Sequence, residues 1–449
     1  MANNQRTILV LGAGRSASTL LRYLNDEAAE NNWKVLVADI DESLANSKTK
    51  SFPYCDGLGL DINDRESLSS KVADCNLVIS MLPARFHPLV AEICVENQTH
   101  MVTASYLSDE MKALDTQAKD AGVILLNEVG VDPGIDHMSA MQMLDRLRKE
   151  RAEFTCFESF TGGLLAPESE NNPWKYKFTW NPRNVVLAGQ GGAVKFIQEG
   201  RYKYIPYHQL FRRTEFIDIE GYGRFEGYAN RDSLWYREAY GLEEIPTIYR
   251  GTLRRPGFCR AWDVFVKLGA TDDSYHLSDS ENMTYRQFIN TFLAYHPTDS
   301  VELKLRSYLH IDQDSEIMEK LEWLGIFENK VIGLKNATPA QILQHILEEK
   351  WKMDEKDKDM IIMWHKVGFT LNGRKHEINS AMVDIGEDNV HTAMSRTVGL
   401  PVGISAKMIL NREIDLTGTH IPVKPNIYEP ILKELERFGI RFIEREVML

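Results

Sequence analysis

The chain has 449 residues, of which 43% are hydrophobic and 26% charged, and its net charge is −13 at pH 7. This length predicts two or three domains, and the composition is that of a globular protein. The acidic balance, with no cluster of Lys and Arg, excludes the basic face of a typical nucleic-acid binder. No apolar run is long enough to span a membrane, and the polar start MANNQRT lacks the core of a signal peptide, so we expect a cytoplasmic protein with no membrane contact.

A glycine turn follows the first predicted strand, residues 8–11. Its spacing is G-x-G-x-x-A, and a helix-like pattern begins at about residue 16. The first glycine permits a tight turn, the second lets backbone approach a pyrophosphate, and the free N–H groups of a helix start favour phosphate. We expect cofactor contacts from Gly12, Gly14, Arg15, Ser16 and Ala17.

A second predicted strand, residues 34–40, contains Asp39 near its end. An acid at this position typically bonds the ribose hydroxyls of NAD and repels the 2′-phosphate of NADP. The sequence therefore favours NAD over NADP.

Strands and helices continue to alternate as far as residue 130, which predicts a doubly wound α/β sheet over residues 1–130. Ligands of such sheets gather at the carboxyl ends of the strands. Asp61 is placed toward the adenine side, and Leu82 and Pro83 end a buried strand where a loop should face the cofactor.

The pattern changes at NEVGVDPGIDHM. Asp132 and Pro133 look like the cap and first residue of a helix, whose apolar face is marked by Ile135, Met138, Met141 and Leu144. Capping and a substrate role are both open for Asp132. For His137, in the first turn of this helix, packing and a role in the site are both open.

Residues 131–275 and 355–390 are strand-rich and predict a mixed-sheet α+β substrate domain. Residues 276–354 read as a small helical subdomain, in which Thr338 and Pro339 start a helix. Asn372 and Gly373 join two strands as a hairpin. The segment 390–449 is helix-forming again and is expected to pack back on the first domain.

The five cysteines, Cys55, Cys75, Cys94, Cys156 and Cys259, are scattered and lack C-x-x-C spacing. They are typical of reduced thiols, and we expect no metal site.

Motifs along nearly the whole chain resemble those of one enzyme family. In chain order they are LGAG, LVISMLP, HMVTASY, NEVGVDPGIDHM, GGLLAPES, NNPWKYKFTW, EGYANRDS, RGTLRRPGF, LEWLGIF, DKDMIIMWH and AMSRTVGLP. Together they resemble the glutamate-forming saccharopine dehydrogenases, also called saccharopine reductases. The D-P-G-I-D-H and N-R-D-S segments are the specific part of this resemblance.

The resemblance implies a nucleotide domain, a substrate domain and a small helical domain, with substrate held in the cleft between the first two. It implies the reversible NAD(P)-dependent oxidation of saccharopine to L-glutamate and 2-aminoadipate 6-semialdehyde through an imine. By matching motif, it also implies substrate contacts from Tyr106, Asp132, Thr161, Gly162, Gly163 and Arg231.

The chain departs from the family pattern at two positions. Thr161 stands where many members have cysteine, so no thiol can act there. Asp39 stands where NADP-using fungal members have no acid, which again favours NAD.

Saccharopine is a secondary amine with three carboxylates, so its enzyme must neutralise charge and manage protons. Tyr106 and Asp132 are our catalytic candidates, for proton handling or for orienting the amine. Arg231 is the first candidate for clamping a carboxylate, with Arg254 and Lys177 as second candidates. The family and the hairpin also suggest a homodimer.

Two other functions compete with this one. A carboxynorspermidine-type synthase would act on a diamine, and would need acidic groups where this chain has Arg-rich loops. A catalytically silent nucleotide-binding sensor would bind the reduced cofactor without any substrate-dependent oxidation.

Overall fold

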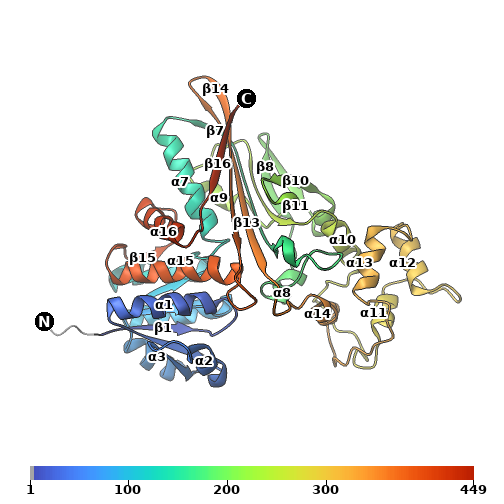
Figure 1. Cartoon of the computed structure of the whole chain (residues 1–449), viewed down its shortest axis with the longest axis horizontal. Helices are drawn as coiled ribbons and strands as arrows, with labels where there is room; N and C mark the ends of the chain where they lie inside the picture. Colours follow the sequence, from blue (N-terminus) through green and yellow to red (C-terminus); the bar gives the residue numbers. More distant parts are fainter. Residues whose placement is uncertain (1–4) are drawn as a thin grey trace. The chain divides into compact units, whose positions relative to one another are not determined.

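The structure is a computed structural model that describes residues 5–449 (Figure 1). The start of the polar N-terminus, residues 1–4, lies outside the described residues. Contacts divide the chain into two compact units. Of the described residues, unit 1 holds 5–153, 371–373 and 382–444, and unit 2 holds 154–370, 374–381 and 445–449. The domain boundaries expected from the sequence stay predictions.

Unit 1 contains a parallel sheet with the strand order β15-β6-β5-β4-β1-β2-β3. Crossover helices join its successive strands, so the predicted doubly wound α/β fold is confirmed. The sequence pattern does not indicate β3, because aspartate and glycine are poor strand formers. The strands are β1 (Arg6–Leu11), β2 (Trp33–Asp39), β3 (Cys55–Gly59), β4 (Leu77–Ser80), β5 (His100–Thr103), β6 (Ile124–Leu126) and β15 (Gly418–His420).

The helices of unit 1 come from both ends of the chain. They are α1 (Ala17–Asn31), α2 (Glu42–Thr49), α3 (Arg65–Ala73), the 3₁₀ turn η1 (Ala84–Phe86), α4 (His87–Glu96), α5 (Asp109–Ala113), α6 (Asp115–Asp120), α7 (Ile135–Lys149), α15 (Ala393–Leu410) and α16 (Pro425–Arg437). The predicted apolar face of α7 is buried. The predicted C-terminal helix is α15, whereas the single helix predicted over residues 109–122 is divided into α5 and α6.

Two glycines let α15 lie directly against α1, and Figure 1 shows the two helices side by side. A Cβ on Gly399 would lie 2.8 Å from the backbone nitrogen of Leu20, and one on Gly403 would lie 2.6 Å from the ring of Tyr23. Both distances are shorter than van der Waals contact. The close packing of the first and the penultimate helix of the chain therefore depends on the missing side chains.

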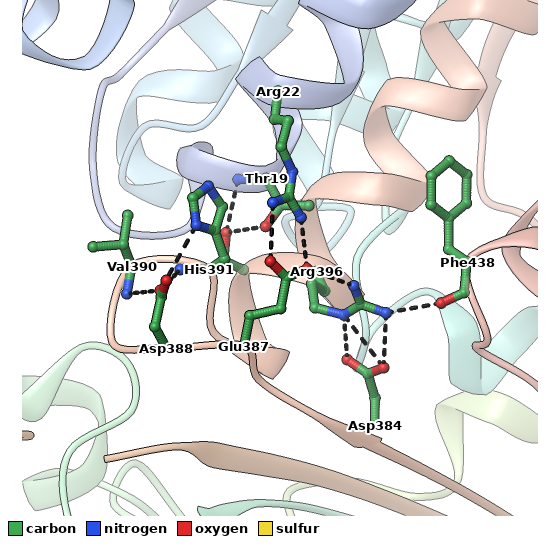
Figure 2. A network of polar contacts seen from close by, with 10 residues as sticks. Thr19, Arg22, Asp384, Glu387, Asp388, Val390, His391, Arg396 and Phe438 are labelled. Carbon is green, nitrogen blue, oxygen red and sulfur yellow. Dashed lines mark hydrogen bonds and ion pairs between the residues drawn. The ribbon is translucent and has the colours of Figure 1, made fainter. Parts of the chain in front are cut away.

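A network of ion pairs lies beside this helix contact (Figure 2). Both guanidinium Nη atoms of Arg22 on α1 donate to Glu387, at 3.0 and 2.8 Å. Arg396 on α15 pairs with the buried Asp384 at 3.0 Å and donates to the carbonyl oxygen of Phe438 at 2.8 Å. Burial raises the pKa of Asp384, and Arg396 opposes that effect. The network fixes the C-terminal segment within unit 1.

Unit 2 is built on a mixed sheet with the strand order β10-β11-β12-β7-β13-β14-β16, and β8 joins β12 and β9 beside it. The β12 and β7 pair is parallel, whereas β10, β11 and β12 pair antiparallel. The strands are β7 (Glu153–Leu165), β8 (Val194–Gln198), β9 (Arg201–Ile205), β10 (Thr214–Ile219), β11 (Gly223–Ala229), β12 (Ile248–Arg254), β13 (Asp359–Leu371), β14 (Arg374–Ile385) and β16 (Ile443–Met448).

The helices of unit 2 are mostly short. They are η2 (Pro167–Ser169), α8 (Pro182–Val186), η3 (Tyr207–Arg212), α9 (Trp235–Ala239), α10 (Phe258–Leu268), α11 (Tyr285–Thr291), α12 (Val301–Leu309), α13 (Glu316–Trp323) and α14 (Pro339–Lys350). The helical stretch expected over residues 276–354 is present as α11 to α14.

Two local signals read from the sequence are confirmed. Thr338 caps α14 through a capping box with Gln341. Asn372 and Gly373 both have positive φ, as the turn of a two-residue hairpin requires.

Within residues 5–449, no helix combines the length and the apolar composition needed to cross a membrane.

Candidate functional site

The glycine turn lies at the carboxyl end of β1. Gly12 has φ +99°, and a Cβ there would lie 3.1 Å from the carbonyl oxygen of Met81, so the position requires glycine. A Cβ on Gly14 would meet no atom within 4 Å, so the space over this glycine is open. Together with the start of α1, this open backbone turn fits a pyrophosphate group.

The C-terminal segment caps part of the same helix. The hydroxyl of Ser395 on α15 accepts a hydrogen bond from the backbone N–H of Thr19 at 3.0 Å and donates to its Oγ1 at 2.9 Å. The N–H groups of Gly12, Ala13 and Ala17 also donate within the protein. Among the described residues, the N–H groups of Gly14, Arg15 and Ser16 are therefore the candidate donors to phosphate.

Asp39 turns its carboxylate toward the glycine turn. Oδ2 accepts a hydrogen bond from the N–H of Ala13 at 2.9 Å, and Oδ1 accepts one from the N–H of Asp41 at 3.1 Å. The carboxylate therefore has a structural role in shaping this turn, besides any contact with a ribose.

Two cations lie near the start of α1. Arg15 is exposed, and the ammonium of Lys48 on α2 bonds the Ser18 hydroxyl at 3.0 Å. Burial and, after it, the charge of Arg15 lower the pKa of Lys48. The sequence predicted Arg15 as a cofactor contact but missed Lys48, because nothing in the local pattern indicates that this side chain returns to α1.

The other predicted cofactor residues also lie beside the sheet. Ser16 and Ala17 begin α1, and Leu82 and Pro83 follow β4. Asp61 follows β3, and its Oδ1 accepts hydrogen bonds from the backbone and side chain of Asn63, both at 2.9 Å. Their contacts with a cofactor stay predictions.

The two catalytic candidates come together in unit 1. The hydroxyl of Tyr106, in the loop after β5, lies 3.5 Å from Oδ1 of Asp132, in the loop after β6. Both side chains are partly exposed. A tyrosine hydroxyl beside a carboxylate at the carboxyl edge of the sheet can bind an amine and exchange protons with it.

The capping role considered for Asp132 is wrong. The helix α7 begins at Ile135, and Gly134, with φ +149°, occupies the cap position. The cap is Gly134 because the carboxylate of Asp136 accepts its N–H at 2.6 Å and the loop closes through Gly130. Asp132 is thereby left outside the helix.

A buried histidine holds the loop that carries Tyr106. One ring nitrogen of His87 hydrogen-bonds Ser80 Oγ at 2.9 Å, and the other hydrogen-bonds Ser105 Oγ at 2.6 Å. Burial lowers the pKa of His87 to about 4, so the ring is neutral at neutral pH. A neutral ring can donate to one hydroxyl and accept from the other, which matches the two contacts.

In unit 2, the predicted Thr161-Gly162-Gly163 turn is part of β7. Gly162 is required there, because a Cβ would lie 2.8 Å from Leu253 on the neighbouring strand. The hydroxyl of Thr161 is buried and has no hydrogen-bond partner among the described residues. A buried hydroxyl without a partner is costly, and a bound polar ligand would satisfy it.

The three basic candidates of unit 2 have different surroundings. Arg231 is exposed, with φ +54°. Arg254 is buried among aromatic rings, with its guanidinium 5.0 Å from the Tyr176 ring, and its Nη1 donates to the carbonyl oxygen of Leu253 at 2.8 Å. Lys177 forms ion pairs with Asp354 at 2.8 Å and Asp357 at 2.6 Å.

The arrangement around Lys177 argues against the predicted carboxylate clamp. Burial lowers the pKa of Lys177, but the hydrogen bonds that its ammonium donates to the two carboxylates outweigh this effect, and the net result is a raised pKa. Its charge is already neutralised by Asp354 and Asp357, which favours a structural role for Lys177. The carboxylate contacts predicted for Arg231 and Arg254 stay predictions.

A parallel sheet with an open glycine turn, and a tyrosine–carboxylate pair at the carboxyl edge of that sheet, are typical of a nucleotide-dependent oxidoreductase. Comparison with known proteins gives the family. Residues 8–126 match the model of the saccharopine dehydrogenase NADP binding domain, and residues 130–440 match that of the saccharopine dehydrogenase C-terminal domain. The chain belongs to the saccharopine dehydrogenase family.

Individual relatives agree along the whole chain. A saccharopine dehydrogenase [NADP(+), L-glutamate-forming] of Schizosaccharomyces pombe is 32% identical, over 98% of this chain and 99% of that protein. The mitochondrial alpha-aminoadipic semialdehyde synthase of Mus musculus is 32% identical, over 98% of this chain and 48% of its own length. The solved structure of apo saccharopine dehydrogenase (L-Glu forming) from Saccharomyces cerevisiae matches with a TM-score of 0.90 and 30% identity, over 98% of this chain and 100% of that one.

These comparisons correct the predicted preference for NAD. The nucleotide segment matches a model described as NADP binding, and the fungal relatives are named for NADP(+). The prediction relied on Asp39 facing the ribose, whereas its two carboxylate oxygens accept backbone N–H groups of Ala13 and Asp41. An acid at the end of β2 is therefore not sufficient to choose the cofactor.

Proposed function

We propose that this protein oxidises saccharopine with NADP⁺ and water, and releases L-glutamate, 2-aminoadipate 6-semialdehyde, NADPH and a proton. The observation that carries the proposal is the similarity from end to end to enzymes named for this reaction, 32% identity over 98% of the chain. Arg15 and Lys48 support the choice of cofactor, because two cations near the start of α1 favour the extra phosphate of NADP.

A bound NADP⁺ would supply the hydride acceptor for oxidation at the carbon that becomes the aldehyde. Oxidation of that C–N bond gives an imine, water adds to its carbon, and the carbinolamine splits into the amine of glutamate and the aldehyde. The turn at Gly12 and Gly14 would hold the pyrophosphate. Asp132 and Tyr106 would orient the secondary amine and take up or return its protons.

The substrate carboxylates need positive charge in a protein of net charge −13. Arg254 supports a clamp because its buried guanidinium lies among the rings of Tyr176, Tyr228 and Phe258 without an ion-pair partner in the described chain. Arg231 is the exposed second cation. The unpartnered hydroxyl of Thr161 would donate to a third oxygen.

The test is turnover of the purified protein with saccharopine and either NADP⁺ or NAD⁺, followed by the absorbance of the reduced nicotinamide. We expect NADP⁺ to be favoured at least about tenfold in kcat/KM, equivalent to about 1.4 kcal/mol. Tyr106→Phe should lower kcat about a hundredfold. Arg254→Met should mainly raise KM for saccharopine.

Absence of saccharopine turnover with both cofactors would refute the proposed substrate, and reductive condensation of a diamine would then be tested. Binding of NADPH without any turnover would indicate the sensor function. A homodimer in the cytoplasm is part of the same proposal, and sedimentation equilibrium of the purified chain checks the dimer.

A further inference from the structure

Both neighbours of Tyr106 in the chain are held by one residue, Glu128. The backbone N–H of Glu128 donates to the carbonyl oxygen of Ser105 at 3.0 Å. Its side-chain Oε1 accepts the N–H of Leu107 at 2.8 Å. The main chain and the side chain of Glu128 thus each form a hydrogen bond with the loop, one on either side of Tyr106.

The carboxylate of Glu128 is itself fixed by His137 on α7. Oε2 of Glu128 lies 2.6 Å from Nε2 of His137, and the side chains are 1% and 0% exposed. Glu128 has φ +59°, a backbone conformation that residues other than glycine rarely adopt. Hydrogen bonds to Leu107 and His137 offset the cost of burying this carboxylate, and strained backbone conformations of this kind cluster at functional sites.

The contacts of Glu128 and His87 show which part of the loop they hold in place. The loop after β5 is anchored at Ser105 Oγ by His87 and at its backbone by Glu128, so Tyr106 is the residue between two fixed points. Its hydroxyl then lies 3.5 Å from Asp132, which belongs to the same loop of the chain as Glu128. The two catalytic candidates are therefore joined through one buried side chain.

We propose that Glu128, oriented by His137, is a positioning residue that fixes Tyr106 opposite Asp132 for the reaction. The inference rests on the proposed function only in that Tyr106 acts on the substrate. The carboxylate can accept hydrogen bonds from Leu107 and His137 at once, and it selects the His137 tautomer that carries its proton on Nε2. Glutamine could accept from Leu107 only by presenting its NH₂ group to His137.

The test is a double-mutant cycle with Tyr106→Phe. A residue that acts through the Tyr106 hydroxyl must lose its effect once that hydroxyl is gone. We expect Glu128→Gln to lower kcat at least about tenfold in the wild-type background and less than about twofold in Tyr106→Phe, with KM for saccharopine nearly unchanged. Equal factors in both backgrounds would overturn the proposal.

Glu434→Gln is the matched control. This carboxylate is also in unit 1 and nearly buried, and it bonds Tyr23 at 2.6 Å and Lys407 at 2.9 Å, on α1 and α15. It should lower thermal stability without any coupling to Tyr106. Comparable coupling would mean that general loss of stability produces the effect, and would also overturn the proposal.

A second readout needs no substrate. In protein labelled with ¹³C at tyrosine Cζ, the resonance missing from Tyr106→Phe belongs to Tyr106. Glu128→Gln should shift it, and Glu434→Gln should leave it in place; an unchanged resonance in Glu128→Gln would overturn the proposal. If Glu128→Gln does not fold, His137→Gln should give the same shift. If wild type does not oxidise saccharopine, the proposed function fails while this readout still decides the role of Glu128.

Discussion

The buried His87 makes the stability of unit 1 depend on pH. Its ring lies between two serine hydroxyls, and burial lowers its pKa to about 4, against 6.5 in an exposed histidine. Above about pH 7.5 the ring is neutral both folded and unfolded, so stability does not change with pH through this group. As the pH falls below that value, the unfolded chain binds the proton first. Between about pH 7.5 and pH 5 this costs the folded state about 2 kcal/mol.

The assay compares wild type with His87→Gln, in which nothing titrates at this position. Hydrogen exchange followed by mass spectrometry, on peptides covering residues 77–103, gives the free energy of opening of this part of unit 1. The advantage of wild type over the variant should shrink by about 2 kcal/mol on lowering the pH over that range. His208→Gln, at an exposed histidine, controls for the loss of a histidine in general. A difference between wild type and His87→Gln that stays constant with pH would refute the reasoning.

Three further substitutions test the glycine turn and the packing of the C-terminal segment on unit 1. Gly12→Ala should weaken NADPH binding at least about tenfold in a fluorescence titration, because φ is +99° and a backbone oxygen lies 3.1 Å from the new methyl group. Gly399→Val should lower stability by about 2 kcal/mol in a thermal melt, since its Cβ would lie 2.8 Å from the backbone of Leu20. Arg396→Met should cost about 3 kcal/mol in the same assay by leaving Asp384 buried without its cation, and adding Asp384→Asn should recover part of it. No change in melting temperature in Arg396→Met would contradict the importance of this pair.

The features that sequence could predict are those whose signals lie within a few residues. The G-x-G-x-x-A turn of unit 1 and the hairpin at Asn372 and Gly373 each depend on local backbone requirements, and both form as expected. The apolar spacing of α7 likewise predicts its buried face.

The features that it missed depend on partners far along the chain. Lys177 reads as a free cation until Asp354 and Asp357, 177 and 180 residues later, are placed against it. The start of α7 is set by a loop closed through Gly130 instead of by the acid before a proline. Glu128 gives no local signal at all, because its partners are reached only when β5, β6 and α7 are assembled.

The return of the C-terminal segment to unit 1 has a consequence for how the protein is made. The strand β15 extends the sheet beyond β6, and α15 covers α1 through Gly399 and Gly403. During synthesis, roughly the first 150 residues therefore emerge with an unpaired edge at β6 and with α1 uncovered. Both surfaces stay exposed until about 250 more residues have been added and β15 and α15 can pack on them. A fragment ending at residue 153 should be prone to aggregate, so chaperone binding to the nascent chain would be concentrated on this interval of translation.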